Sequence, residues 1–166
     1  MKRILTTLFV LLIAVASFAQ NTYDTVPPFR RFPVVPEFKL LKTDSVTLLT
    51  KGKLKKNKPV LIMFFNPECD HCKHVTEEII QHIDEFKKVQ IVMAAWGPFG
   101  PMKDFYLKYK LSQFKNISVG QDFQNMLQSF YRIHNFPYLA MYDKHGNLLS
   151  TFEGTMKIED LINVFK

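Results

Sequence analysis

The sequence predicts an α/β domain built on a mixed β-sheet, and two observations support this. First, a continuous apolar run at 59–65 is followed by a helical stripe of apolar residues and then by a second apolar run at 89–96. Strand, helix and strand with short joins form a βαβ unit, whose two strands are parallel. Second, the runs 137–143 and 148–154 flank a short turn and predict an antiparallel hairpin. Parallel and antiparallel strands together make the sheet mixed.

The first 19 residues have the pattern of a signal peptide. A positively charged start precedes an apolar run from Ile4 to Val15, and small residues stand at Ser17 and Ala19 before the expected cleavage site. The apolar run is shorter than the roughly 20 residues that span a membrane. We therefore expect an exported protein, periplasmic or extracellular, with no stable membrane insertion after the signal is cleaved. An uncleaved membrane anchor is the alternative.

Removal of 19 residues from 166 leaves 147, the size of one compact domain. Residues 20–36 contain four prolines and predict an extended N-terminal segment rather than a packed element. Residues 37–166 are expected to form the folded domain.

The chain is basic, with a formal charge of +7, of which Lys2 and Arg3 belong to the signal peptide. Five lysines lie in the segment 51–58. A patch for nucleic acid or anionic lipid is one interpretation, but the segment lacks the arginines and interleaved aromatic residues that favour base stacking. A solvated loop before the buried strand is favoured, and no nucleic-acid partner is expected.

The elements follow from local patterns. From Cys72 onward, apolar residues recur three and four positions apart, which predicts one face of an amphipathic helix. Acidic residues in its first half and lysines at its end suit the helix dipole. The segment 97–101, GPFGP, is expected to break the chain. The remaining elements are short strands in FKLLKT, VTLLT and NISVG, and helices over 102–111, 122–133 and 156–165.

Cys69 and Cys72 are the only cysteines, three positions apart, and lie where the first buried strand gives way to the helix. The free N–H groups and the dipole of a helix N-terminus stabilise an anion, and therefore a thiolate at Cys69. His71 adds to this effect and Asp70 opposes it. Because Cys72 lies one turn on, on the buried stripe, Cys69 is expected to be the accessible nucleophile and Cys72 the resolving thiol.

These motifs resemble the thioredoxin superfamily. An apolar strand, Cys-x-x-Cys at the start of a helix, and a later proline starting a strand are together most similar to the extracytoplasmic, TlpA-type thiol–disulfide oxidoreductases. The resemblance implies a mixed sheet with helices on both faces and a redox-active Cys69–Cys72 disulfide as the active group, with no other cofactor and no metal. It also implies a cis-proline at Pro137 facing the cysteines, with Phe136 touching substrate. Implied partners are cysteine-containing exported proteins and a further redox protein.

The sequence also departs from the family. Glu68 stands where many members carry tryptophan and is expected, with Asp70 and His71, to tune the cysteine pair. Trp96 offers the alternative aromatic surface for substrate near the site, unless it packs in the core. Met63 stands where many members bury an acid, so that the proton acceptor for Cys72 and the redox direction stay open. A copper or zinc carrier using the two cysteines with His71 and His74, a structural disulfide, and a redox-sensing binding domain are the alternative interpretations.

Overall fold

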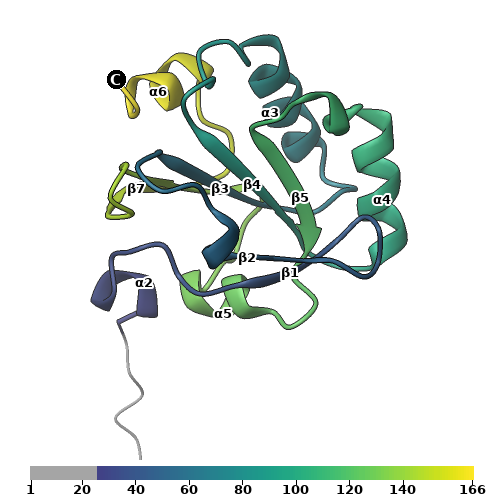
Figure 1. The fold of residues 1–166 in the computed structure, drawn as a ribbon, viewed down its shortest axis with the longest axis horizontal. Helices are drawn as coiled ribbons and strands as arrows, with labels where there is room; N and C mark the ends of the chain where they lie inside the picture. The colour runs from purple at the N-terminus through teal and green to yellow at the C-terminus, as the bar shows by residue number, and fades with distance from the viewer. Residues whose placement is uncertain (1–25) are drawn as a thin grey trace, which may run out of the picture.

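The structure is a computed structural model that describes residues 26–166 (Figure 1). The predicted signal peptide lies outside the described residues. Seven strands form one sheet in the order β2-β1-β5-β4-β3-β6-β7. The strands are β1 (Lys39–Lys42), β2 (Leu48–Thr50), β3 (Val60–Phe65), β4 (Gln90–Ala95), β5 (Ile117–Gln121), β6 (Tyr138–Tyr142) and β7 (Leu148–Glu153).

The central strands β3, β4 and β5 are parallel, and the outer pairs are antiparallel, which confirms the predicted mixed sheet. The helices are α2 (Pro28–Arg31), α3 (Asp70–Gln81), α4 (Phe99–Lys108), α5 (Met126–Tyr131) and α6 (Ile158–Asn163), with 3-10 turns η1 (Lys51–Lys53) and η2 (Leu111–Gln113). No helix within residues 26–166 is long and apolar enough to cross a membrane.

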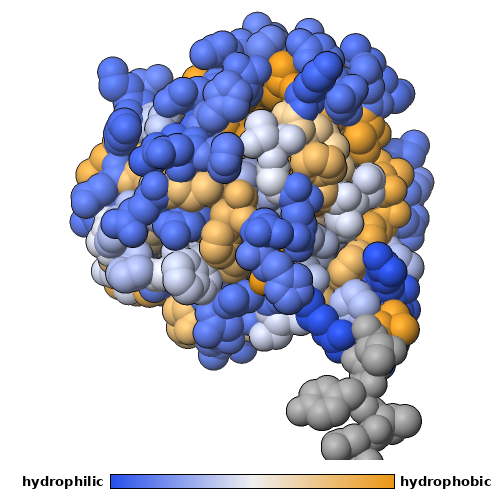
Figure 2. Space-filling view, turned by 180° about the vertical axis from the view of Figure 1, so that it is seen from behind, coloured by the Kyte–Doolittle hydropathy of each residue, from blue (hydrophilic) through white to orange (hydrophobic). Residues whose placement is uncertain are grey.

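Both faces of the sheet are covered by helices (Figure 1), and the surface seen from behind is mostly hydrophilic with separate apolar patches (Figure 2). All six residues of β3 are buried, and its side chains alternate between two apolar clusters. Met63 and Phe65 face the cluster that includes α3, α4 and α6. Ile62 and Phe64 face the cluster that includes α5. The continuous apolar run therefore arises because β3 has no solvent-exposed face.

The proline- and glycine-rich segment 97–101 behaves differently from the prediction. Helix α4 begins inside it at Phe99, directly after Pro98, and includes Pro101. Proline is tolerated in the first turn of a helix because the N–H it lacks has no partner within the helix there. The segment starts the helix rather than separating it from β4.

Two other predicted helices are shorter than expected. After Gln81, the chain continues in turns such as Phe86 N–H to the Ile83 carbonyl (3.1 Å). These turns keep Phe86 in the core although α3 has ended. The predicted helix 122–133 is observed only as α5. The side chain of Asp122 accepts hydrogen bonds from backbone N–H groups at its start, and Arg132, directly after its end, has a left-handed backbone.

The expectation of an extended segment up to residue 36 is wrong for Pro28–Arg31, which is helical, and for Val35, which packs in the core. The Val35 N–H donates to the Gly146 carbonyl (2.9 Å), and the Leu148 N–H donates to the Pro33 carbonyl (2.8 Å). The segment is therefore attached to the turn between β6 and β7.

Candidate active site

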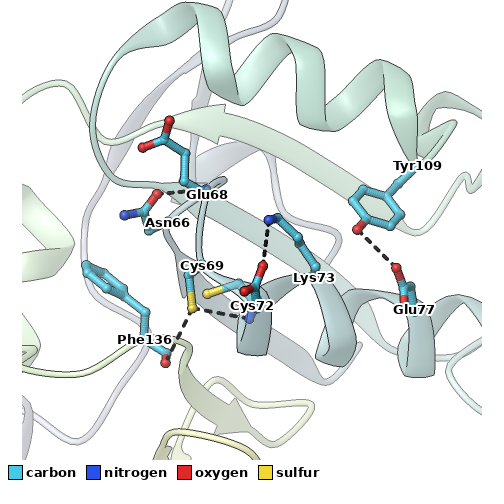
Figure 3. A network of polar contacts seen from close by, with 9 residues as sticks. Asn66, Glu68, Cys69, Cys72, Lys73, Glu77, Tyr109 and Phe136 are labelled. Atoms are coloured by element: carbon cyan, nitrogen blue, oxygen red, sulfur yellow. Dashed lines mark hydrogen bonds and ion pairs between the residues drawn. The ribbon is translucent and has the colours of Figure 1, made fainter.

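The turn between β3 and α3 positions the first cysteine (Figure 3). The Glu68 N–H donates to the side-chain oxygen of Asn66 (2.9 Å), and the Cys69 N–H donates to the Asn66 carbonyl (3.1 Å). Asn followed by proline favours such a turn, because the Asn side chain hydrogen-bonds to the backbone two residues on. Cys69 thereby becomes the N-cap residue of α3.

The sulfur of Cys69 contacts two backbone groups. It accepts a hydrogen bond from the Cys72 N–H (3.4 Å), and its thiol can donate to the Phe136 carbonyl (3.8 Å). The N–H contact stabilises negative charge on the sulfur, because this donor has no partner within the helix. Cys69 is half-buried, and both cysteines are free thiols in the structure.

Cys72 lies beneath Cys69 and is completely buried. Burial raises the pKa of its thiol well above the ordinary value, and the neighbouring Cys69 adds to this effect. The side chain at the expected acid position, Met63, is buried in the same apolar cluster. Glu77, the next acid downstream, accepts a hydrogen bond from the Tyr109 hydroxyl instead (3.1 Å; Figure 3). Cys72 is therefore held as a neutral thiol at neutral pH.

The buried thiol predicts a pH dependence of stability for the reduced protein. Above the ordinary thiol pKa the unfolded chain loses the Cys72 proton whereas the native protein keeps it, so the free energy of unfolding falls as pH rises. We expect an extra fall of about 1.4 kcal/mol per pH unit from about pH 9 upward, compared with Cys72→Ser. Urea unfolding of both proteins between pH 8 and about 10 tests this. The prediction would be contradicted if the free energy of unfolding fell with pH equally in the parent and in Cys72→Ser.

Asp70 forms an ion pair with Lys73, with 2.7 Å between the carboxylate oxygen and Nζ. This hydrogen bond and charge hold the pKa of Asp70 below its ordinary value. Asp70 is expected to oppose a thiolate at Cys69, but the positive charge of Lys73 offsets the charge of its carboxylate. The spacing of three residues on one helix is a signal from which this pair could have been predicted.

The other two predicted tuning residues, Glu68 and His71, are both exposed. The backbone of Glu68 takes part in the turn before α3. The Nδ1 atom of His71 lies 3.3 Å from the hydroxyl of Thr155, in the loop between β7 and α6. His71 is therefore positioned by a contact that joins α3 to the C-terminal part of the chain.

The three residues predicted to bind substrate are Phe136, Pro137 and Trp96, and Phe136 connects them to Cys69 through its backbone carbonyl. The Phe136–Pro137 peptide bond is cis, and Pro137 is buried at the start of β6. The Phe136 ring lies between Phe64 and Trp96, with centroid distances of 5.8 and 5.7 Å. Trp96 directly follows β4 and is 39% exposed, so it is not a core residue. Phe136 and Trp96 therefore form an aromatic wall on the side of the site where the Phe136 carbonyl contacts the Cys69 sulfur.

Within the described part of the chain, no three His, Cys, Asp or Glu residues are grouped so that they could hold a metal ion. The alternative set, made of the two cysteines with His71 and His74, does not come together. Cys72 is enclosed by apolar side chains, whereas both histidines are exposed.

Comparison with known proteins identifies the family to which the fold belongs. A family model described as a thioredoxin-like domain matches residues 50–166. None of the curated proteins that were compared matches the chain.

Several solved structures share the fold. A secreted disulfide oxidoreductase of Mycobacterium tuberculosis, homologous to E. coli DsbE, is 20% identical, with 76% of this chain and 92% of that chain covered and a TM-score of 0.64. A DsbE-type putative thiol:disulfide interchange protein of Chlorobium tepidum is 18% identical (79% and 92% covered, TM-score 0.65). The exposed lipoprotein thioredoxin of Streptococcus pneumoniae is 24% identical (77% and 96% covered, TM-score 0.57). With the family model spanning most of its length, the chain belongs to the thioredoxin-like family.

Proposed function

We propose that this protein is an exported thiol–disulfide oxidoreductase, with Cys69 as nucleophile and Cys72 as resolving thiol. The observation that carries the proposal is the unequal placement of the two sulfurs. Cys69 is half-buried at the start of α3 and accepts the Cys72 N–H, whereas Cys72 is sealed in the core. A structural disulfide would have no need of one accessible sulfur, and the small loop it closes would stabilise little.

In the reducing direction, the Cys69 thiolate attacks one sulfur of a substrate disulfide. The substrate S–S bond breaks, one substrate thiolate leaves, and a mixed disulfide with Cys69 forms. Cys72 then attacks Cys69, and its proton is taken up by the departing substrate sulfur, so that the Cys69–Cys72 disulfide forms and the second substrate thiol is released. Two electrons pass from the protein to the substrate. The oxidising direction reverses these steps, and the reduction potential measured against glutathione determines which direction operates.

The proposed substrates are cysteine-containing exported proteins, and a further redox protein would restore the starting state of the cysteine pair. An extended substrate segment would lie along Phe136 and Pro137, with the aromatic wall of Trp96 and Phe136 beside it. Export is supported by the pattern of residues 1–19 and by the fold shared with proteins whose names call them secreted or exposed. No nucleic-acid partner and no cofactor other than the cysteine pair are proposed.

Trapping the mixed disulfide tests this function. The Cys72→Ser variant lacks the resolving thiol, so we expect it to accumulate covalent complexes with partner proteins through Cys69. These complexes should be visible on non-reducing gels and should disappear on reduction. The matched control is the variant with both cysteines replaced by serine, which should capture nothing. Equal capture by the two variants, or capture by Cys69→Ser in place of Cys72→Ser, would contradict the assigned roles.

A further inference from the structure

A second feature lies far from the cysteines, at the end of the sheet where β3 and β4 begin. Two hollows of about 630 and 200 Å³ open there, and both are lined by Lys58 and Val89. Eight lysines line them, and we call this surface the lysine face. They come from five separate segments: Lys53, Lys55, Lys58, Lys87, Lys88, Lys115, Lys144 and Lys166.

The lysine face holds the net charge of the described domain. The acids lining the two hollows are Glu85 and Asp143, which gives the face a formal side-chain charge of +6. The other described residues have 12 basic and 12 acidic side chains and are neutral in sum. Asp84 forms an exposed ion pair with Lys87 (3.0 Å), and such pairs contribute little. The net positive charge of residues 26–166 is therefore concentrated at one end of the domain.

Two side chains fix the backbone of the lysine-bearing loops. The Gln90 amide donates to the carbonyls of Lys55 and Lys58, at 2.9 and 3.5 Å. The Asn116 amide donates to the carbonyls of Phe86 and Val89, at 2.9 and 3.3 Å. The charged side chains are exposed, but the segments that present them are held in place. A partner would therefore meet a formed surface rather than a loop that has to be ordered first.

The composition of the face favours lipid over nucleic acid. None of its lining residues is an arginine, the side chain best suited to paired phosphate contacts and base stacking. The floor of the larger hollow is apolar, with Pro59, Val89 and Ile162, and Leu149 on its edge is 48% exposed. Apolar area surrounded by lysines suits a surface with anionic headgroups above hydrocarbon.

We propose that the lysine face docks the protein onto an anionic phospholipid bilayer, by electrostatic attraction and without a membrane-spanning element. The face lies at the beginning of β3, and Cys69 follows the end of the same strand. Six strand residues separate the two ends by about 20 Å, at about 3.3 Å per residue. Docking therefore directs the cysteine pair away from the membrane. This inference is independent of the direction of thiol exchange.

Vesicle co-sedimentation of the protein from residue 20 onward, the product of the expected signal cleavage, and of two matched variants of it tests the docking. The first variant, Lys53→Gln/Lys88→Gln/Lys144→Gln, removes three charges from the face. The second, Lys39→Gln/Lys103→Gln/Lys157→Gln, removes three exposed charges from elsewhere. All three proteins have the same N-terminus, so its contribution to binding cancels. The vesicles are phosphatidylcholine alone, or phosphatidylcholine with about 30% phosphatidylglycerol.

We expect binding to the phosphatidylglycerol vesicles to exceed binding to phosphatidylcholine, and to be lost in about 0.5 M salt. The face variant should bind the anionic vesicles about 10- to 100-fold more weakly than the parent, and the second variant within about threefold of it. Equal loss in the two variants would overturn the proposal, because net charge alone would then explain binding. Salt-resistant binding to both vesicles, or binding of a single-stranded oligonucleotide in place of vesicles, would also overturn it. Unchanged melting temperatures show that both variants fold.

The orientation is tested separately with a water-soluble maleimide. On the vesicle-bound protein, Cys69 should be labelled at the same rate as in free solution, because it lies at the far end of β3. Protection of Cys69 by anionic vesicles would overturn the inferred orientation even if the lysine face binds.

Discussion

Replacing Gly120 with alanine is expected to lower the free energy of unfolding by about 1–3 kcal/mol, the usual range for overpacking. Gly120 lies in β5 next to β1, and its pairing partner across the two strands is Lys42. A Cβ built at this position would lie 2.8 Å from the Cβ of Leu40 and 3.1 Å from the Leu41 carbonyl oxygen. Neither neighbour is the end of a flexible side chain, so β1 and β5 must move apart to admit one methyl group.

The matched control is Gly100→Ala, which should raise the free energy of unfolding rather than lower it. Gly100 lies in α4, and a Cβ there would meet no atom within 4 Å. Alanine in a helix is favoured over glycine by roughly 0.5–1 kcal/mol, so Gly100→Ala should stabilise the protein. Urea unfolding measures both changes. A Gly120→Ala protein as stable as the parent would mean that β1 and β5 are not packed as closely as described.

Replacing Asp122 with alanine should cost about 2–3 kcal/mol of stability, because it removes the buried acceptor of three backbone N–H groups, of which that of Leu127 is buried. The carboxylate of Asp122 is 3% exposed and accepts the N–H groups of Met126, Leu127 and Gln128, at 3.0, 2.9 and 3.4 Å. These bonds fix the start of α5, and the chain that leaves α5 continues directly to Phe136 and Pro137. The rate of thiol–disulfide exchange should therefore fall together with stability.

Asp104→Ala, which removes an exposed carboxylate from α4, is the control for loss of an acid as such. It should change the free energy of unfolding by less than about 0.5 kcal/mol. Thermal or urea unfolding gives the stability, and the rate of reduction of a model disulfide gives the activity. If Asp122→Ala resembled Asp104→Ala in both measurements, the cap on α5 would not support the Phe136 loop.

The sequence allowed the centre of the fold to be predicted because the signals there are local. Six consecutive buried residues identify β3, and apolar positions at helical spacing identify α3. The placement of Cys69 follows from these two elements alone. The start of α4 differs from the prediction, because Pro98 and Pro101 resemble a chain break in the sequence whereas proline is compatible with a helix start.

Other features depend on contacts between distant segments. The packing of Trp96 on Phe136 needs the order of β4, β3 and β6 in the sheet, which no local pattern specifies. In the sequence the lysines of 51–58 resemble an ordinary solvated loop. They become part of the lysine face only because folding brings Lys88, Lys115 and Lys144 to the same end of the sheet.

The attachment of the N-terminal segment limits how far this protein can be shortened. Pro33 and Val35 precede β1, and their backbones hydrogen-bond to Leu148 and Gly146, respectively. A fragment that begins at β1 would leave the Leu148 N–H and the Gly146 carbonyl without these partners. It would also leave a cavity in the apolar cluster where the Val35 side chain packs. Recombinant versions intended for crystallisation or NMR should therefore keep Pro33 and everything after it.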